Sequence, residues 1–484
     1  MEARIPKGSV RTRFAPSPTG YMHVGNLRTA LYTWLIARHE GGTFILRIED
    51  TDQGRLVEGA QEVIYKTMKE CGLDHDEGPD VGGPVGPYIQ TERRDLYGKY
   101  AERLIARGHA YRCFCEKAES EEDSGEFNRG DDPCRSLSAA EADAMAAEGK
   151  PFVVRQKIPH EGETVFHDEI FGDIRVENST LDDQVLMKRD GLPTYNFANV
   201  IDDHLMGITH VVRGSEYLSS APKYNLLYEG FGWEIPKYVH CSPVMRDQQH
   251  KMSKRHGDPS YEDLIANGYL TDAVLNYVAL LGWSPGGEQE IYSLDELKDI
   301  FRISGISKSP AIFDIEKLRY FNAAYIRAME PAAFAAVAEP YIRQAVKNPA
   351  YDAGEIAALL QQRTEILTEI PEKLDFFDEL PEYDTALFTH KKSKSDAASS
   401  AEVLQQVLPL FEGMEAWTEE NILAVLGELT ERMGVKTAKV MWPVRIAAAG
   451  KAVTPGGAVE ICHILGRDET LRRIRIALEK LANA

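Results

Sequence analysis

Cysteine, long apolar runs and positive charge are all scarce in this chain. Six cysteines without regular spacing among 484 residues predict a reducing compartment and no disulfide framework. No apolar run approaches the roughly 18 residues that a membrane-spanning helix requires. The first fourteen residues, MEARIPKGSVRTRF, lack the apolar segment of a secretory signal. We therefore expect a cytoplasmic protein that makes no membrane contact.

The balance of charge gives little information about partners. The formal net charge is −21 at pH 7, which by itself disfavours binding to nucleic acid. A large enzyme needs only a local basic strip, however, and the chain has three candidates: Lys251–Arg255, Lys391–Lys394 and Arg467–Arg475. Basic clusters of this size are more typical of solvated surfaces. Charge therefore neither identifies nor excludes such a partner.

The most informative stretch is 11–26, which reads RTRFAPSPTGYMHVGN. Alternating residues at its start predict a short strand, and the PSPTG segment predicts a turn. Residues 27–35 have helical periodicity, with Asn26 as the expected N-cap. A strand, a turn and a helix N-terminus in this order direct backbone N–H groups at an anion, usually phosphate. The imidazole of His23 and the close approach that Gly25 permits suit the same ligand, so the stretch predicts a nucleotide site.

Polar side chains follow two further predicted strands. Residues 44–48 alternate like a strand and end in a group of carboxylates that begins with Glu49. Strand, helix and strand then form a βαβ unit, whose carboxylates lie at the same sheet edge as His23. The alternative is a charged loop that caps the following helix. Arg213 ends an apolar strand, and it either forms an internal ion pair or binds a ligand carboxylate in bidentate fashion.

The pattern along the chain predicts an α/β fold with additional domains. Sheet-like segments run through 1–107 and resume over 189–258, so a Rossmann-like parallel-sheet catalytic core is expected from these two halves. Between them, 108–188 is interpreted as an inserted α+β subdomain. From residue 259 the pattern is helical, and we expect two all-helical regions, 259–330 and 331–484.

The predicted insertion contains a group of cysteines that suggests zinc. Cys113 and Cys115 form a C-x-C pair, and Cys134 follows about twenty residues later. A structural zinc site requires four nitrogen or sulfur ligands, and the fourth candidate position is Ser136, which is not a usual ligand. We therefore expect no bound metal.

Several motifs in fixed order resemble those of the class I aminoacyl-tRNA synthetases. The PSPTGxxHVGN turn and the KMSKR loop at 251–255 are similar to the two signature motifs of that class. RFAPSPTG with RIEDTD, and PTYNFAN followed by DDH, resemble the glutamyl-tRNA synthetase branch, and the helical final third resembles its bacterial form. The resemblance covers essentially the whole chain. It implies ATP-dependent ligation of L-glutamate to the 3′ end of tRNA(Glu) through a glutamyl-adenylate, with release of AMP and diphosphate.

The resemblance also implies partners and residue roles. ATP would bind with Mg²⁺ across the strand-to-helix turn, and the loop lysines would neutralise charge while glutamate attacks the α-phosphate. The tRNA would contact the insertion with its acceptor end, 259–330 with its stem and 331–484 with its anticodon, and the protein would be a monomer. Ser136 stands where many relatives have histidine. The implied residues are His23, Lys251 and Lys254 for catalysis, His23, Gly25, Glu216, Met245 and Lys254 for ATP, and Arg13, Ser17, Glu49, Tyr195, Asn199 and Arg213 for glutamate.

Three alternatives remain open. A non-discriminating enzyme would also glutamylate tRNA(Gln). Glutaminyl-tRNA synthetases share the framework, but their first motif usually has Glu and Asn where this chain has Ser17 and Thr19. A binding or scaffold protein that has kept the fold and lost activity belongs to another class. The presence of His23, Gly25 and both loop lysines disfavours that reading.

Overall fold

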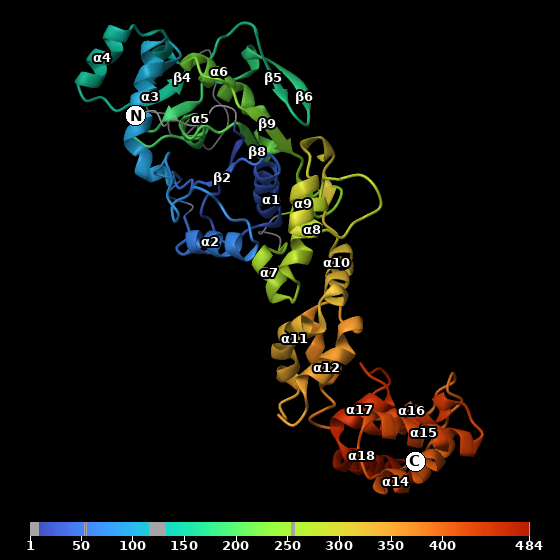
Figure 1. The fold of residues 1–484 in the computed structure, drawn as a ribbon. Coiled ribbons are helices and arrows are strands. Elements are labelled where there is room, and N and C mark those ends of the chain that lie inside the picture. Colours follow the sequence, from blue (N-terminus) through green and yellow to red (C-terminus); the bar gives the residue numbers. More distant parts are fainter. Residues whose placement is uncertain (1–8, 53, 55, 116–131, 253–256, 484) are drawn as a thin grey trace. The chain divides into compact units, whose positions relative to one another are not determined.

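The chain forms two compact units, and each is described here by itself. The first unit comprises Met1–Ile265 and Thr271–Ile315, and the second comprises Ala266–Leu270 and Glu316–Ala484. Figure 1 shows a sheet with surrounding helices in the first unit and helices in the second. The computed structural model describes residues 9–52, 54, 56–115, 132–252 and 257–483.

A six-stranded sheet in the order β2-β1-β8-β9-β5-β6 forms the centre of the first unit. Strand β1 (Arg11–Phe14), helix α1 (Val24–His39) and strand β2 (Thr43–Leu46) form the predicted parallel βαβ unit. Strands β8 (His210–Gly214) and β9 (Lys237–Cys241) extend the sheet in the same direction. The carboxyl ends of all four strands therefore meet at one edge. The predicted α/β class with a parallel-sheet core is confirmed.

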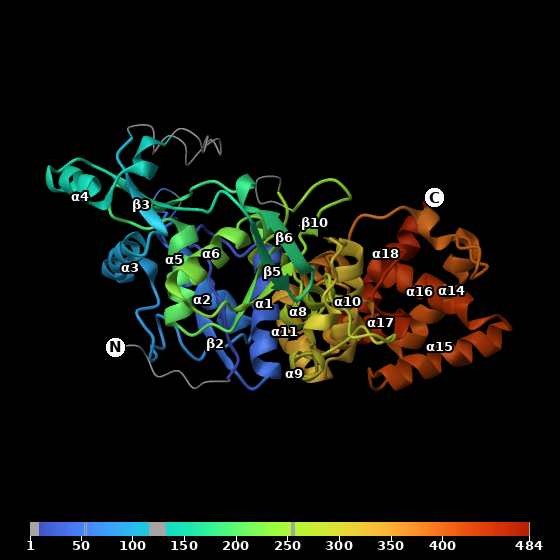
Figure 2. The same cartoon turned by 90° about the horizontal axis from the view of Figure 1, so that it is seen from above.

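Strands from the predicted insertion divide between two sheets. Strands β5 (Glu163–Asp168) and β6 (Gly172–Glu177) form an antiparallel hairpin, and β5 joins the central sheet in parallel with β9. The separate antiparallel sheet contains β3 (Ala110–Cys113), β4 (Val153–Gln156) and β7 (Val185–Met187). In Figures 1 and 2, helix α4 (Ala139–Ala147) lies away from the β5–β6 hairpin.

The alternating pattern of β5 explains its position in the central sheet. Thr164, Phe166 and Asp168 are buried, whereas Val165 between them is 44% exposed. One face of the hairpin therefore packs on the core, and its last residue, Asp168, is carried beside Tyr238 of β9. This register brings a carboxylate from the predicted insertion into the centre of the first unit.

Helices pack against the central sheet of the first unit. A separate, short sheet contains two strands. Tyr97 of α3 (Arg94–Ala106), Phe197 of α5 (Tyr195–Leu205) and Tyr224 of α6 (Ala221–Phe231) are buried in one apolar core against the sheet. Strands β10 (Val244–Met245) and β11 (Ala311–Ile312) pair in parallel. The helices are α2 (Ala60–Glu70), α3 (Arg94–Ala106), α4 (Ala139–Ala147), α5 (Tyr195–Leu205), α6 (Ala221–Phe231), α7 (Tyr261–Ala266), α8 (Thr271–Leu280) and α9 (Leu294–Ile300).

The final third is helical, as the sequence predicted. The apolar faces of its helices enclose a core that includes Phe334, Leu404, Leu426 and Ile474. Among the residues that the structure describes, no helix is both long enough and apolar enough to cross a membrane. The helices are α10 (Ile315–Ala328), α11 (Pro331–Ala345), α12 (Ala353–Leu360), α13 (Ile370–Leu374), α14 (Ala397–Glu412), α15 (Glu419–Met433), α16 (Thr437–Ala449), α17 (Ala458–Leu465) and α18 (Arg467–Ala482).

One of the basic clusters considered as a surface strip includes a buried structural residue. Arg473 is fully buried, and its Nη1 donates to the carbonyl oxygens of Phe376 and Ala448, each at 2.7 Å. Its Nη2 donates to the carbonyl oxygen of Phe377 at 2.9 Å. These bonds satisfy backbone groups that lie inside the helical core. The interpretation of Arg473 as part of a solvated face or nucleic-acid strip is wrong.

Candidate functional site

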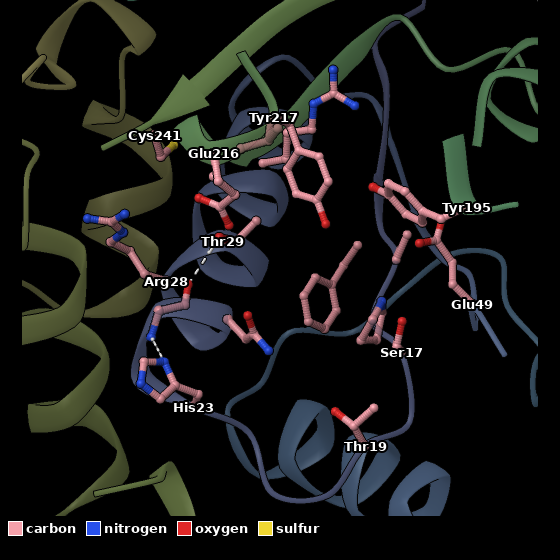
Figure 3. Close-up of a pocket in the computed structure, with 18 of the residues that line it drawn as sticks. Ser17, Thr19, His23, Arg28, Thr29, Glu49, Tyr195, Glu216, Tyr217 and Cys241 are labelled. Carbon is pink, nitrogen blue, oxygen red and sulfur yellow. Dashed lines mark hydrogen bonds between the residues drawn. The ribbon is translucent and has the colours of Figure 1, made fainter. Parts of the chain in front are cut away.

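A cavity of about 400 Å³ lies where the carboxyl ends of β1 and β8 meet the N-terminus of α1. In Figure 3, His23 lies at one end of this cavity, and Glu49 and Tyr195 lie on the opposite wall. Segments far apart in the sequence thus converge at the predicted sheet edge. The predicted site residues that line the cavity are Arg13, Ser17, His23, Gly25, Glu49, Tyr195, Arg213, Glu216 and Lys251.

Three predicted site residues are not among those lining the cavity. Met245 lies beside it, and its neighbour Val244 forms part of the wall. Asn199 is buried behind the wall, where its Nδ2 donates to the carbonyl oxygen of Tyr195 at 2.8 Å. Asn199 thus supports the helix that carries Tyr195. Lys254 lies outside the described residues.

Helix α1 begins three residues earlier than the sequence predicted, and the expected Asn26 cap is wrong. His23 is the N-cap: its Nδ1 accepts a hydrogen bond from the Gly25 N–H at 3.0 Å. A Cβ atom at position 25 would lie 3.2 Å from this Nδ1, so glycine suits the cap. With Nδ1 as an acceptor, the neutral imidazole carries its proton on Nε2. The His23 ring therefore lies at the N-terminus of α1, beside the backbone N–H groups that attract anions.

A buried ion-pair network supports one wall of the cavity. The Nε of Arg13 lies 3.0 Å from Oδ1 of Asp203, and Nη1 of Arg47 lies 2.7 Å from the same oxygen. Nη2 of Arg47 lies 2.8 Å from Oε1 of Glu49. Burial alone would raise the pKa of Asp203, but Arg13 and Arg47 outweigh it, and the pKa lies below its ordinary value. The charge of Arg13 is therefore balanced within the protein.

Glu49 keeps some capacity for a further cation. It is 5% exposed, and burial raises its pKa above the ordinary value even though Arg47 lies beside it. A second positive group in the cavity would favour the carboxylate form. Its backbone is also fixed beside the turn, because the Glu49 N–H donates to the carbonyl oxygen of Pro16 at 3.1 Å. Glu49 therefore lines the cavity, as the functional interpretation of this segment predicted.

Arg213 differs from Arg13 because none of the described carboxylates pairs with it. It is 5% exposed, and its Nε donates to Nε2 of His240 at 3.0 Å. Its Nη2 is buried and has no hydrogen-bond partner among the described residues. The guanidinium carbon lies 4.6–5.3 Å from the ring centroids of three tyrosines, Tyr217, Tyr224 and Tyr238. Of the two alternatives that the sequence left open, the internal ion pair is absent from the described part of the chain.

Lys251 and Glu216 form a weak ion pair at the other end of the cavity. The Nζ of Lys251 lies 3.4 Å from Oε2 of Glu216, and both side chains are more than half exposed. An exposed pair of this kind contributes about 1 kcal/mol or less. The lysine can therefore exchange this partner for a phosphate at little energetic cost.

The cysteines of the insertion lie together with the carboxylate of Asp132. One ligand atom from each of Cys113, Cys115, Asp132 and Cys134 lies within 4.8 Å of the others. The two sulfur atoms of Cys115 and Cys134 are 3.8 Å apart, close to the separation of about 3.8 Å expected for tetrahedral zinc with Zn–S bonds of about 2.3 Å. Ser136 instead donates to the carbonyl oxygen of Pro133. Three thiols and one carboxylate fit a structural zinc ion.

This geometry favours zinc over the predicted absence of a metal, and metal analysis decides between the two. We expect the purified protein to contain close to one zinc ion per chain, and Asp132→Asn to lower the content because a neutral amide binds zinc more weakly. Metal analysis by mass spectrometry measures this directly. Ser136→Ala is the matched control and should keep its zinc. A wild-type protein without zinc, or equal losses in both variants, would contradict the assignment of Asp132.

Comparison with known proteins shows the family. Residues 9–320 match the family model "tRNA synthetases class I (E and Q), catalytic domain", and residues 328–478 match "Anticodon binding domain". The chain is 59% identical over 479 residues to a Glutamate--tRNA ligase of Clostridium botulinum (strain Hall), with 98% of each chain covered. It is 55% identical to that of Clostridium tetani, again with 98% of each chain covered.

A solved structure supports the same relationship. The crystal structure of a glutamate tRNA ligase from Elizabethkingia meningosepticum CCUG26117, in complex with its amino acid, matches with a TM-score of 0.88 and 35% identity. The match covers 98% of this chain and 100% of that one. The resemblance seen in the sequence motifs is confirmed, and the chain belongs to the class I tRNA synthetases of the glutamate and glutamine type.

Proposed function

We propose that the protein ligates L-glutamate to the 3′ end of tRNA(Glu), with ATP as the second substrate. The observation that carries this proposal is the buried, positively charged Arg213, with which no carboxylate of the described residues pairs, in a cavity that His23 and Lys251 also line. A buried cation that no anion balances is costly, and a ligand carboxylate at this position offsets the cost. Glutamate carries such a carboxylate at the end of its side chain.

Glutamate is bound between two charged groups on opposite sides of the cavity. Arg213 takes the side-chain carboxylate, and Glu49 takes the α-ammonium group. Ser17 and Tyr195 complete this wall. Glutamine would leave the Arg213 charge unpaired, and a site with such an unpaired buried group rejects an analogue by about 10⁴-fold or more. Discrimination of this size requires no editing domain.

ATP lies across the N-terminus of α1. Helix N–H groups, with His23 and Gly25, face its phosphates, and Glu216 and the backbone beside Met245 hold the nucleoside. Mg²⁺ accompanies the triphosphate and supplies charge neutralisation. Lys251, together with Lys254 from the neighbouring segment, stabilises the negative charge that develops during transfer.

The chemistry proceeds in two balanced steps. An α-carboxylate oxygen of glutamate attacks the α-phosphorus, and the bond to diphosphate breaks with its electron pair leaving on diphosphate. A terminal ribose hydroxyl of the tRNA then attacks the carbonyl carbon of the adenylate, loses its proton and releases AMP. The protein supplies orientation and electrostatic stabilisation and forms no covalent bond in either step.

The other parts of the chain bind the tRNA. We assign 108–188 to the acceptor end, 259–330 to the stem and 331–484 to the anticodon, which fits the anticodon-binding family model over 328–478. We further propose a monomer that resides in the cytoplasm. All six cysteines are unpaired, as is usual in a reducing compartment.

Aminoacylation of two purified tRNAs tests this function directly. Radiolabelled glutamate should attach to tRNA(Glu) only when ATP is present, and tRNA(Gln) should remain uncharged. Attachment to both tRNAs would identify the non-discriminating form. Attachment to neither, with the protein folded, would favour an inactive scaffold and contradict the proposal.

A further inference from the structure

A row of three buried side chains leads away from the cavity behind Arg213. The Nε of Arg213 donates to Nε2 of His240 at 3.0 Å, and Nδ1 of His240 lies 2.6 Å from Oδ2 of Asp168. His240 and Asp168 are fully buried, and Arg213 is 5% exposed. Each member comes from a different strand of the central sheet, β8, β9 and β5 respectively.

The arginine fixes the proton positions in this row. A guanidinium has only donors, so Nε2 of His240 must be the acceptor and Nδ1 must carry the proton. Nδ1–H then donates to Asp168. Burial lowers the pKa of His240 and the charge of Arg213 lowers it further, while the bond to Asp168 opposes them; the net direction is downward and favours the neutral ring.

Asp168 is itself held firmly. Its Oδ1 accepts from the N–H groups of Ile170 and Phe171 at 2.9 and 2.8 Å. Its Oδ2 also accepts from the backbone N–H of His240 at 3.2 Å. Burial alone would raise the pKa of Asp168, but the hydrogen bond from the His240 ring and those from the Phe171 and Ile170 N–H groups outweigh it, and the pKa lies below the ordinary value. The carboxylate therefore orients the imidazole from a fixed position.

We infer that His240, oriented by Asp168, is a positioning residue for recognition of the glutamate side chain. The inference rests on the proposed function of Arg213. Because Nε is occupied by His240, the guanidinium presents its Nη end to the ligand, and the three tyrosine rings limit its rotation. A carboxylate can then be bound by the two Nη groups.

The neutral ring has a second consequence for specificity. A carboxylate in direct contact with Arg213 would form an ion pair and balance its charge, as Asp203 does for Arg13. The imidazole accepts the Nε–H hydrogen bond without carrying negative charge. The row thus fixes the direction of Arg213 while its positive charge remains available to glutamate.

Two substitutions of His240 test whether its ring orients Arg213 or only fills space in the core. The amide oxygen of glutamine can occupy the place of Nε2 and accept from Arg213, whereas asparagine reaches only the place of Nδ1. We expect His240→Asn to raise the KM for glutamate about 10- to 100-fold, the loss typical of one charged hydrogen bond. His240→Gln should remain within about threefold of the wild type. The KM for ATP should change less than about twofold in both variants.

Asp168→Asn gives an independent route if His240→Asn does not fold, as judged by thermal unfolding. It weakens the bond to Nδ1–H and should raise the KM for glutamate by about three- to tenfold, with the KM for ATP unchanged. Equal effects of His240→Gln and His240→Asn, or equal rises in both KM values, would overturn the inference.

Arg213→Gln, measured in the same assay, tests separately whether Arg213 binds the glutamate side chain. If that variant keeps its KM for glutamate, the proposed function of Arg213 fails. If it loses glutamate binding while the folded His240 and Asp168 variants do not, the positioning role alone fails.

Discussion

Arg213→Gln lowers kcat/KM for glutamate by about 10³-fold, while the KM for ATP changes less than about threefold. Removing one partner of a buried charged pair costs about 2–5 kcal/mol, which corresponds to about 30- to 5,000-fold. The upper part of this range applies because Arg213 is 5% exposed and is held by His240 and three tyrosine rings. Aminoacylation kinetics with each substrate varied in turn measure the two constants.

A surface arginine provides the matched control for this substitution. Arg103 lies on α3 and does not line the cavity, so Arg103→Gln should leave both constants unchanged. Thermal unfolding should be similar for Arg213→Gln and the wild type if the loss is one of recognition. Equal losses for glutamate and ATP would show that Arg213 supports the fold of the site and does not recognise the amino acid.

Lys254→Ala is expected to reduce kcat for aminoacylation by about 10²-fold or more, the usual loss when one preorganised charge is removed from a transition state. The KM for glutamate should change little, because the charge acts while the α-phosphate is attacked. Lys251→Ala should cause a smaller loss, because Lys251 is more than half exposed and shares its charge with Glu216. Single-turnover measurement of adenylate formation, with tRNA present, reports on this step.

An exposed lysine on α2 provides the matched control for the catalytic role assigned to Lys254. Lys69→Ala removes an exposed lysine from α2, away from the cavity, and should leave kcat unchanged. If Lys254→Ala retained near-normal kcat, the catalytic role assigned to Lys254 would be wrong. A fall in thermal stability together with kcat would instead point to a structural role.

Local sequence patterns predicted the parts of the fold that depend on near neighbours. The βαβ unit of β1, α1 and β2 follows from alternation, turn residues and helical periodicity within about 40 residues of chain. The helical final third was likewise predicted from helical periodicity within each segment. The family resemblance carried by the order of motifs then implied nine residues that line the cavity, from Arg13 to Lys251, whereas Asn199 and Met245 do not line it.

Contacts between distant segments could not be predicted in this way. Asp168 joins the site only because β5 pairs with β9, and no pattern near residue 168 indicates that partner. His240 lies in an apolar strand, where its spacing resembles that of a core residue. Asp132 lies beside the three cysteines and is two residues from Cys134, but a lone aspartate does not stand out from the spacing of cysteine and histidine ligands.

Competition between equally good local signals explains the remaining errors. Asn26 is a better N-cap by residue type than His23, yet the helix begins at Val24 because the His23 imidazole accepts from the Gly25 N–H. Arg473 is in a basic run, and its burial depends on carbonyl groups of Phe376 and Ala448 that lie far away in the sequence. The start of the helix is thus decided by a local side-chain hydrogen bond, and the burial of Arg473 by tertiary packing.

A crystal structure of this protein with bound L-glutamate tests the account most directly. We expect the side-chain carboxylate within about 2.7–2.9 Å of the Nη atoms of Arg213, the ammonium group beside Glu49, and the bond between Arg213 and His240 intact. Glutamate bound with its side-chain carboxylate away from Arg213, or with its ammonium group on the opposite side from Glu49, would contradict it.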